Sequence, residues 1–171
     1  MQTKISASLA ILTLLLTFSA FPIASASESH STHFKASFSG PFHIIASTPT
    51  TITVALTGEG RATHLGDSKI SATVTIVLAT GVGTSTDVTI TRANGGEHED
   101  SQVEKLFLTT VTSETPPSPQ GIITLSGTYT ITGGSGDLRG ATGSGTLSGT
   151  VSLPAGTVSQ TFSGTITLPD E

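Results

Sequence analysis

The stretch from Thr128 to Thr146 constrains the fold more than any other part of the sequence. It reads TYTITGGSGDLRGATGSGT: a segment alternating polar and apolar residues enters a glycine cluster, and a second alternating segment leaves it. Five glycines lie between Gly133 and Gly143. Glycine within a sheet costs backbone entropy, so such a cluster indicates special backbone angles or a close approach of chains. The stretch therefore predicts a tight strand–turn–strand unit in an antiparallel all-β domain.

The same two-residue alternation recurs along most of the chain. In the segment from Val158 to Leu168, apolar residues occupy one face of the predicted strand, and Thr and Ser occupy the other. Similar rows fill residues 52–56, 70–78, 123–131 and 142–153. Such alternation is typical of half-buried antiparallel strands with one face on a core, and β-branched Thr suits the opposite face.

The turn-forming residues divide these rows into about eight strands. We expect strands at 32–39, 42–57, 68–80, 86–93, 101–112, 121–132, 142–153 and 157–168. The predicted turns are Ser39-Gly40-Pro41, Gly58 to Gly60, Gly81 to Gly83, Asn94-Gly95-Gly96, Pro116 to Gly121, the Gly133 cluster and Pro154-Ala155-Gly156. Short connections favour an up-and-down meander, and closing it into a barrel removes the exposed edges of an open sheet. A two-sheet sandwich is the alternative.

The first 26 residues have the pattern of a signal peptide. Lys4 precedes a ten-residue apolar run, Leu9 to Phe18, and Ala24-Ser25-Ala26 supplies a cleavage site of small residues. Ten apolar residues are too few for a permanent membrane span. We therefore predict a secreted or extracytoplasmic, soluble chain with no stable membrane insertion, whose residues 27–171 form one domain.

Composition excludes several classes of function. Without Lys4 the seven basic residues become six, against 12 acidic ones, so residues 27–171 carry a net charge of −6. No basic cluster exists, which argues against nucleic acid and anionic membranes as partners. The chain has no tryptophan and no cysteine. The absence of cysteine excludes thiol chemistry, disulfides and thiolate metal sites.

At the glycine cluster the chain resembles the allene oxide cyclase and dirigent barrels, whose strand–turn–strand element reads approximately GGTGRF before a Gly/Ala stretch. The corresponding residues here are Gly133-Gly134-Ser135-Gly136-Asp137-Leu138, then Gly140-Ala141-Thr142-Gly143. Bacterial relatives are also similar at residues 58–66 and 93–95. Asp137-Leu138 departs from the family's basic–aromatic pair. The resemblance implies an eight-stranded barrel whose interior has room for side chains or one small ligand. The cyclases' active-site residues do not map onto this chain position by position.

The most polar candidate site surrounds His64. Glu59, Arg61 and Asp67 lie close by in sequence, which suggests a cluster at a barrel mouth with His64 as acid–base or as a hydrogen-bond donor to a ligand. The alternative is a β-bend in which the His64 imidazole hydrogen-bonds the backbone and Arg61 and Asp67 form a surface pair.

Tyr129 and Arg139 are the remaining candidates. Tyr129 falls on an apolar face, so its hydroxyl could orient a ligand oxygen, or it could be an ordinary core tyrosine. Arg139 could contact an acidic ligand or fix the glycine turn together with Asp137. Glu97-His98-Glu99-Asp100 lacks the spacing of a cation site, and we expect no metal and no cofactor.

Three functions compete. The residues favour an exported barrel that binds a small apolar molecule, or a secreted module without catalysis. The alternative is a cofactor-free cyclase or isomerase, with Tyr129, His64 and Glu59 catalytic and with Arg61, Asp67 and Arg139 in contact with the ligand. The third is an interaction protein that uses its Thr/Ser rows. The sequence leaves open whether the chain forms a homo-oligomer.

Overall fold

The structure is a computed structural model that describes residues 30–93 and 103–169. The predicted leader at 1–26, the turn at Asn94-Gly95-Gly96 and the acidic segment Glu97-His98-Glu99-Asp100 lie outside the described residues. Among the residues that are described, no helix is long and apolar enough to cross a membrane.

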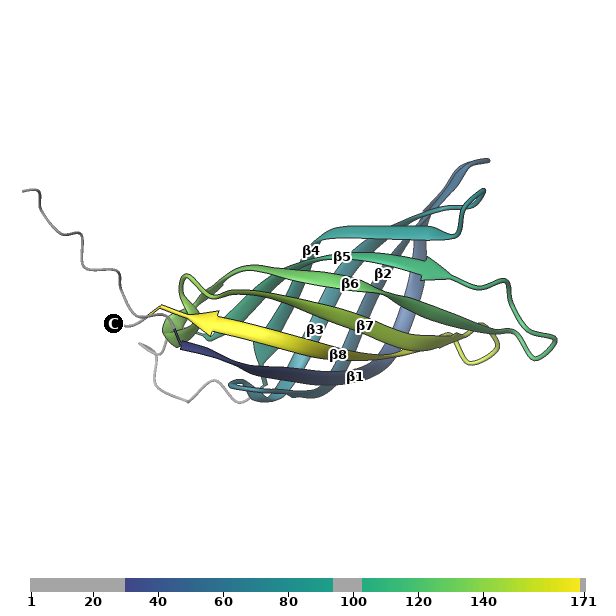
Figure 1. The fold of residues 1–171 in the computed structure, drawn as a ribbon. Helices are drawn as coiled ribbons and strands as arrows, with labels where there is room; N and C mark the ends of the chain where they lie inside the picture. The colour runs from purple at the N-terminus through teal and green to yellow at the C-terminus, as the bar shows by residue number, and fades with distance from the viewer. Residues whose placement is uncertain (1–29, 94–102, 170–171) are drawn as a thin grey trace, which may run out of the picture.

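Eight antiparallel strands close into a single barrel in chain order, because β1 pairs with both β2 and β8 (Figure 1). The strands are β1 (His30–Ser47), β2 (Thr51–Ala62), β3 (Gly66–Val77), β4 (Val82–Arg92), β5 (Lys105–Glu114), β6 (Ile122–Ser135), β7 (Thr142–Ser152) and β8 (Thr157–Leu168), with a 3-10 turn, η1 (Gly136–Leu138), between β6 and β7. The prediction of an eight-stranded up-and-down barrel is confirmed, and the sandwich is not formed.

The alternating rows have the predicted orientation. Their apolar members point into the barrel, and several of them have no exposed surface: Phe34, Ile90, Leu106, Phe162 and Ile166. Most Ser and Thr residues between them are exposed or half-exposed. Burying each large apolar side chain contributes about 1.5–3 kcal/mol, so the inward rows supply the main driving force for closing the sheet.

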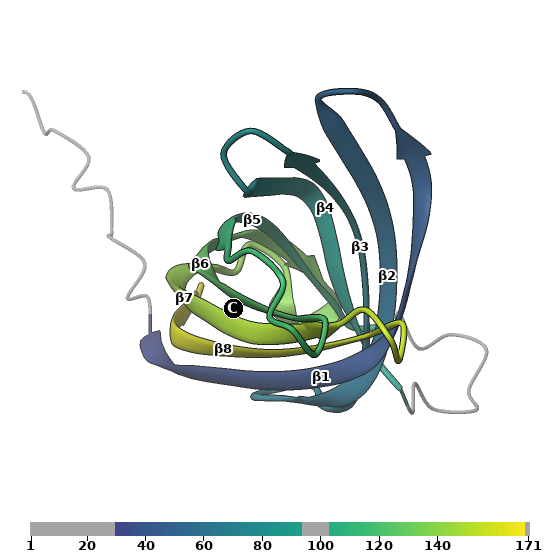
Figure 2. The same cartoon turned by 90° about the vertical axis from the view of Figure 1, so that its right-hand side faces the viewer.

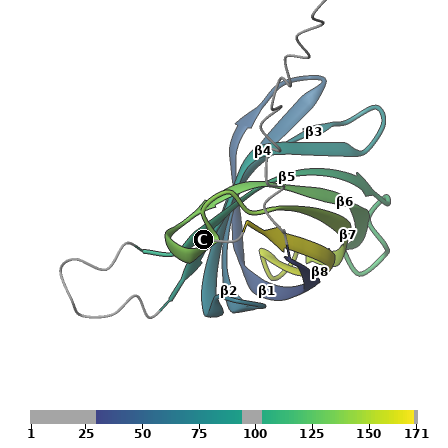
Figure 3. The same cartoon turned by 60° about the vertical axis from the view of Figure 1, so that its left-hand side comes forward.

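The two ends of the barrel differ. We call the end that holds η1 and the β2–β3 turn the closed end; Figure 3 brings it forward. The opposite, open end carries the β1–β2 and β3–β4 hairpins, the loop between β5 and β6, and the β7–β8 turn. Figure 2 looks into the open end, where the two hairpins splay away from β5–β8. The barrel thus widens from the closed end to the open end.

Two of the predicted turns are wrong, because Gly40-Pro41 and Gly58 to Gly60 lie inside β1 and β2. A Cβ atom at Gly60 would lie 1.8 Å from the Ser37 carbonyl oxygen, and one at Gly40 would lie 2.2 Å from that of Thr57. These glycines therefore mark a close approach of two strands rather than a reversal. Pro41 is opposite Thr157, where β8 begins, so its missing N–H falls at the end of a ladder.

The glycine cluster does contain the predicted turn, although β6 runs through Gly133 and Gly134 before the chain reverses. Gly136 and Gly140 have φ angles of +63° and +76°, which disfavour residues with a Cβ. Between them, the Leu138 side chain is buried and covers the closed end of the core. Special backbone angles thus account for the turn itself.

Candidate functional site: a cavity at the open end

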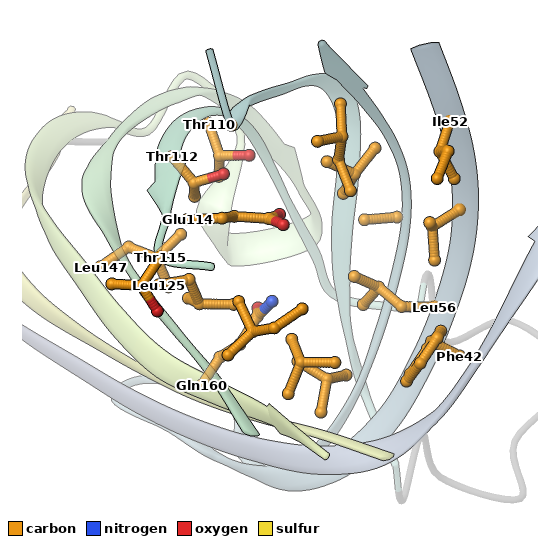
Figure 4. A pocket seen from close by; sticks show the side chains of 18 of the residues that line it. Phe42, Ile52, Leu56, Thr110, Thr112, Glu114, Thr115, Leu125, Leu147 and Gln160 are labelled. Atoms are coloured by element: carbon orange, nitrogen blue, oxygen red, sulfur yellow. The ribbon is translucent and has the colours of Figure 1, made fainter. Parts of the chain in front are cut away.

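A cavity of about 640 Å³ occupies the open half of the barrel (Figure 4). Ligand sites for drug-sized molecules commonly measure about 300–1,000 Å³. One wall is aliphatic and comes from neighbouring strands: Ile52, Val54 and Leu56 of β2, and Ala72, Val74 and Ile76 of β3. The facing wall is also mainly apolar: Ile123 and Leu125 of β6, Leu147 and Val151 of β7, and Val158 and Phe162 of β8.

Polar side chains of the cavity form a column on β5; the other polar lining residues are Thr80, Thr115 and Gln160. Thr110, Thr112 and Glu114 are two residues apart, so the pleat of the strand points all three inward. The Thr112 hydroxyl donates a hydrogen bond of 3.3 Å to the Gly83 carbonyl oxygen. The backbone N–H of Glu114 donates to the Gly81 carbonyl oxygen at 2.9 Å, which fixes the end of β5 against β4. The column therefore has a defined position on an otherwise apolar surface.

Among the described residues that line the cavity, Glu114 is the only one with an ionisable side chain. It is half-buried, and loss of hydration raises the pKa of its carboxyl above the ordinary value. The ion pairs seen in the described part of the chain are Arg61–Asp67, Lys69–Glu59 and Arg92–Glu104. None of them involves Glu114, so no basic side chain of the described residues compensates its charge.

The floor of the cavity is aromatic. Phe162 lines the cavity and packs against Tyr129 with 5.5 Å between ring centroids, and Phe34 packs on Tyr129 at 5.8 Å. Tyr129 itself is 1% exposed and does not line the cavity. Its hydroxyl has no hydrogen-bond partner among the described residues, and burial raises the pKa of the phenol. The lumen is therefore filled at the closed end and hollow at the open end.

The structure places His64, Arg61 and Asp67 away from this cavity, at the closed end. His64 forms the β2–β3 turn with a φ of 69°, and its Nε2 lies 3.0 Å from the Thr32 hydroxyl. Arg61 donates from Nε to Asp67 at 2.7 Å, and both side chains are exposed. The bend and the surface ion pair of the alternative are observed, but the His64 imidazole contacts the Thr32 hydroxyl and not the backbone.

Glu59 and Arg139 also lie outside the cavity. Glu59 is on the outer wall, 3.4 Å from the Lys69 Nζ atom, and its side chain is 79% exposed. Arg139 is exposed beside η1. The structure therefore does not bring Tyr129, His64 and Glu59 together: one is inside the core, one is in a turn at the closed end and one is on the outer surface. In the described part of the chain, no group of three or more His, Asp or Glu residues could hold a metal ion.

Sequence reasoning missed Glu114, because the predicted fifth strand ended at residue 112. The pattern that could have identified it is the row Leu106, Leu108, Thr110, Thr112 and Glu114. The first four members are buried on the inner face of β5. Extending the strand by one more inward position would have placed a carboxylate inside the barrel.

No protein-family model matches the sequence, and no curated protein does. Among solved structures, the chain is similar to that of a pterocarpan synthase dirigent protein, with a TM-score of 0.54 and 14% sequence identity. The match covers 93% of this chain and 100% of the other. The resemblance that the glycine cluster suggested is thus confirmed at the level of the fold: the chain has a dirigent-like eight-stranded barrel.

Proposed function

We propose that this protein binds a small, mostly apolar molecule in the cavity at the open end. The observation that carries the proposal is the cavity itself, about 640 Å³ with aliphatic walls and one polar column. An apolar cavity with a few converging polar groups is the usual form of a ligand site. The similarity to a dirigent protein called a pterocarpan synthase supports a barrel that holds small molecules. Export through residues 1–26 stays a prediction.

The other two functions have less support. The separation of Tyr129, His64 and Glu59 removes the geometric reason for assigning them to one catalytic centre. The outward Thr and Ser rows follow the curved wall of a closed barrel, which offers no flat lattice for repeated surface contacts. Binding of a small molecule in the cavity is therefore the function that the described geometry supports best.

The size of the cavity sets the affinity to look for. At about −0.3 kcal/mol per non-hydrogen atom, a ligand of about 20 such atoms gains about −6 kcal/mol. That free energy corresponds to a dissociation constant of about 40 µM. Titrations should therefore cover low micromolar to millimolar concentrations.

Fluorescence of the neutral probe N-phenyl-1-naphthylamine tests the proposal, since the chain has no tryptophan to interfere. Ala72 lines the cavity, and Ala55 lies at the same level of the neighbouring strand with its side chain on the outer face. We expect Ala72→Phe to fill part of the cavity and weaken probe binding at least about tenfold, whereas Ala55→Phe should bind like the wild type. Circular dichroism checks that both variants fold. Equal affinities for the two folded variants, or a wild type that does not bind the probe, would overturn the proposal.

A further inference from the structure

The Glu114 carboxylate enters the cavity from the last residue of β5, and Figure 4 shows its oxygens directed into the interior. Its backbone is held by the hydrogen bond to the Gly81 carbonyl oxygen. Beside it, Gly83 carries no side chain; a Cβ there would lie 3.5 Å from Glu114 Oε1 and 2.6 Å from the Thr112 hydroxyl oxygen. The glycine thus leaves room for the Thr112 hydroxyl, and the carboxylate lies at ordinary contact distance from the same position.

Formal charge is distributed unevenly along the barrel. The lysine and arginine residues of the described chain all lie toward the closed end or on its turns: Lys35, Arg61, Lys69, Arg92, Lys105 and Arg139. His43 lies in the open half of β1, between Phe42 and Ile44, but it is exposed and does not line the cavity. Glu114 therefore faces aliphatic residues, Thr110, Thr112 and Gln160, and no cation. A negative charge between low-dielectric walls makes the cavity attractive to cations and repels anions.

We infer that the ligand carries a protonated amine on an apolar body and that Glu114 is its ion-pair partner. This inference rests on the proposed function. One carboxylate is too few ligands for a metal ion, whereas an ammonium group needs a single charge partner and neutral acceptors for its remaining N–H groups.

The β5 column offers those neutral acceptors. The Thr112 hydroxyl donates its hydrogen bond to the Gly83 carbonyl oxygen, so the hydroxyl oxygen can still accept a hydrogen bond from the ligand. Thr110 is one inward position further along the same strand, and its hydroxyl belongs to the same polar column. The raised pKa of Glu114 agrees with a carboxylate that lacks a counter-charge until a ligand supplies one.

Displacement of N-phenyl-1-naphthylamine by three competitors tests the inference. n-Decylamine, n-decanol and decanoate each have ten carbon atoms and carry positive, neutral and negative head groups at neutral pH. We expect n-decylamine to bind at least about tenfold more tightly than n-decanol, because a charge-assisted contact replaces a neutral one, and we expect decanoate to bind weakest.

Glu114→Gln should keep probe and n-decanol binding and lose the preference for the amine. Asp137→Asn is the matched control: it removes one negative charge from an exposed position at the closed end, and the amine preference should remain. If the probe binds but the three competitors are equivalent, or if Glu114→Gln retains the preference, the inference fails while the proposed function stands. If the wild type does not bind the probe, the proposed function fails first.

Discussion

Replacing Tyr129 by phenylalanine removes a single oxygen atom from the buried aromatic cluster of the barrel. The side chain is 1% exposed and lies between the rings of Phe34 and Phe162. A Cβ atom at Gly145 or Gly164 would lie only 2.7 or 2.6 Å from its hydroxyl oxygen. The oxygen therefore occupies space that two facing glycines leave open, without a hydrogen-bond partner among the described residues.

The structure gives the sign and size of the effect of Tyr129→Phe. Burying a hydroxyl without a hydrogen bond costs about 1–3 kcal/mol, and the substitution removes that cost. It also removes a few dispersion contacts of the oxygen, each contributing about 0.1–0.2 kcal/mol. The net expectation is a stabilisation of about 1 kcal/mol, which raises the melting temperature by about 3–4 °C in a domain of this size.

Urea and thermal unfolding of the wild type and Tyr129→Phe measure this difference, and Tyr129→Leu is the comparison that also removes the ring. Tyr129→Leu should destabilise the fold by about 2–4 kcal/mol, because the loss of an aromatic ring leaves a void between Phe34 and Phe162. A destabilisation of Tyr129→Phe by about 1 kcal/mol or more would refute the reasoning, since it would mean that the hydroxyl has a partner. Loss of probe binding in Tyr129→Phe would instead support the sequence-based hypothesis that this hydroxyl orients a ligand.

Three further substitutions test the energetics of the barrel. Glu114→Gln should raise the melting temperature at neutral pH and have little effect near pH ~4. Because the pKa of Glu114 is raised in the folded state, its carboxyl contributes fully to stability below the unfolded pKa, and this contribution is lost as pH rises through the folded pKa. Asp87→Ala should cost less than about 1 kcal/mol at neutral pH, because water screens the contacts of its exposed carboxylate. Desolvation raises the pKa of Asp87, but hydrogen bonds from Thr73 and Ser85 outweigh it and lower the pKa, so the cost should decrease as pH falls through the folded pKa. Gly145→Ala places a Cβ 2.2 Å from the Ser163 carbonyl oxygen and should cost about 2–4 kcal/mol in urea unfolding, whereas exposed Ser148→Ala on the same strand should change stability by less than about 0.5 kcal/mol.

Where the alternation is regular and the turn residues are unambiguous, the sequence predicts the strands closely. β8 has the predicted bounds, Thr157–Leu168, because Pro154-Ala155-Gly156 reverses the chain immediately before it. The predicted strand 42–57 is wrong, because the chain turns between Ser47 and Thr51 inside it. The two wrong turns in β1 and β2 arise because glycine serves two physical purposes that look alike in a sequence. At Gly60 it allows two backbones to approach closely, and at Gly136 it allows a positive φ; only the second reverses the chain.

The candidate site was less accessible to sequence reasoning, because it depends on which side chains meet across the barrel. Arg61 and Asp67 are close in sequence and flank one turn, so their pairing could be anticipated. The cavity depends on how well the inward side chains fill the local width of the barrel, and this width cannot be predicted from the sequence of any single strand. Glu114 was missed for a simpler reason: it lies two residues beyond the predicted end of its strand. Because side chains alternate between the two faces of a strand, a strand extended to residue 114 would have placed Glu114 inside the barrel.

The closed half of the barrel is filled by side chains and the open half is not, so different residues stabilise the fold and bind the ligand. Toward the closed end the lumen holds the rings of Phe34, Tyr129 and Phe162, which bury large areas and interlock edge to face. Toward the open end the inward positions carry mainly aliphatic side chains such as Ile52, Val54 and Ala72, and the strands diverge, so these side chains leave the cavity between them. A ligand in that space supplies the missing apolar contacts and, at about 100 times its dissociation constant, stabilises the folded state by about 2.7 kcal/mol. Substitutions in the open-end wall should therefore alter ligand affinity more than they alter the stability of the unliganded barrel, whereas substitutions around Tyr129 should do the reverse.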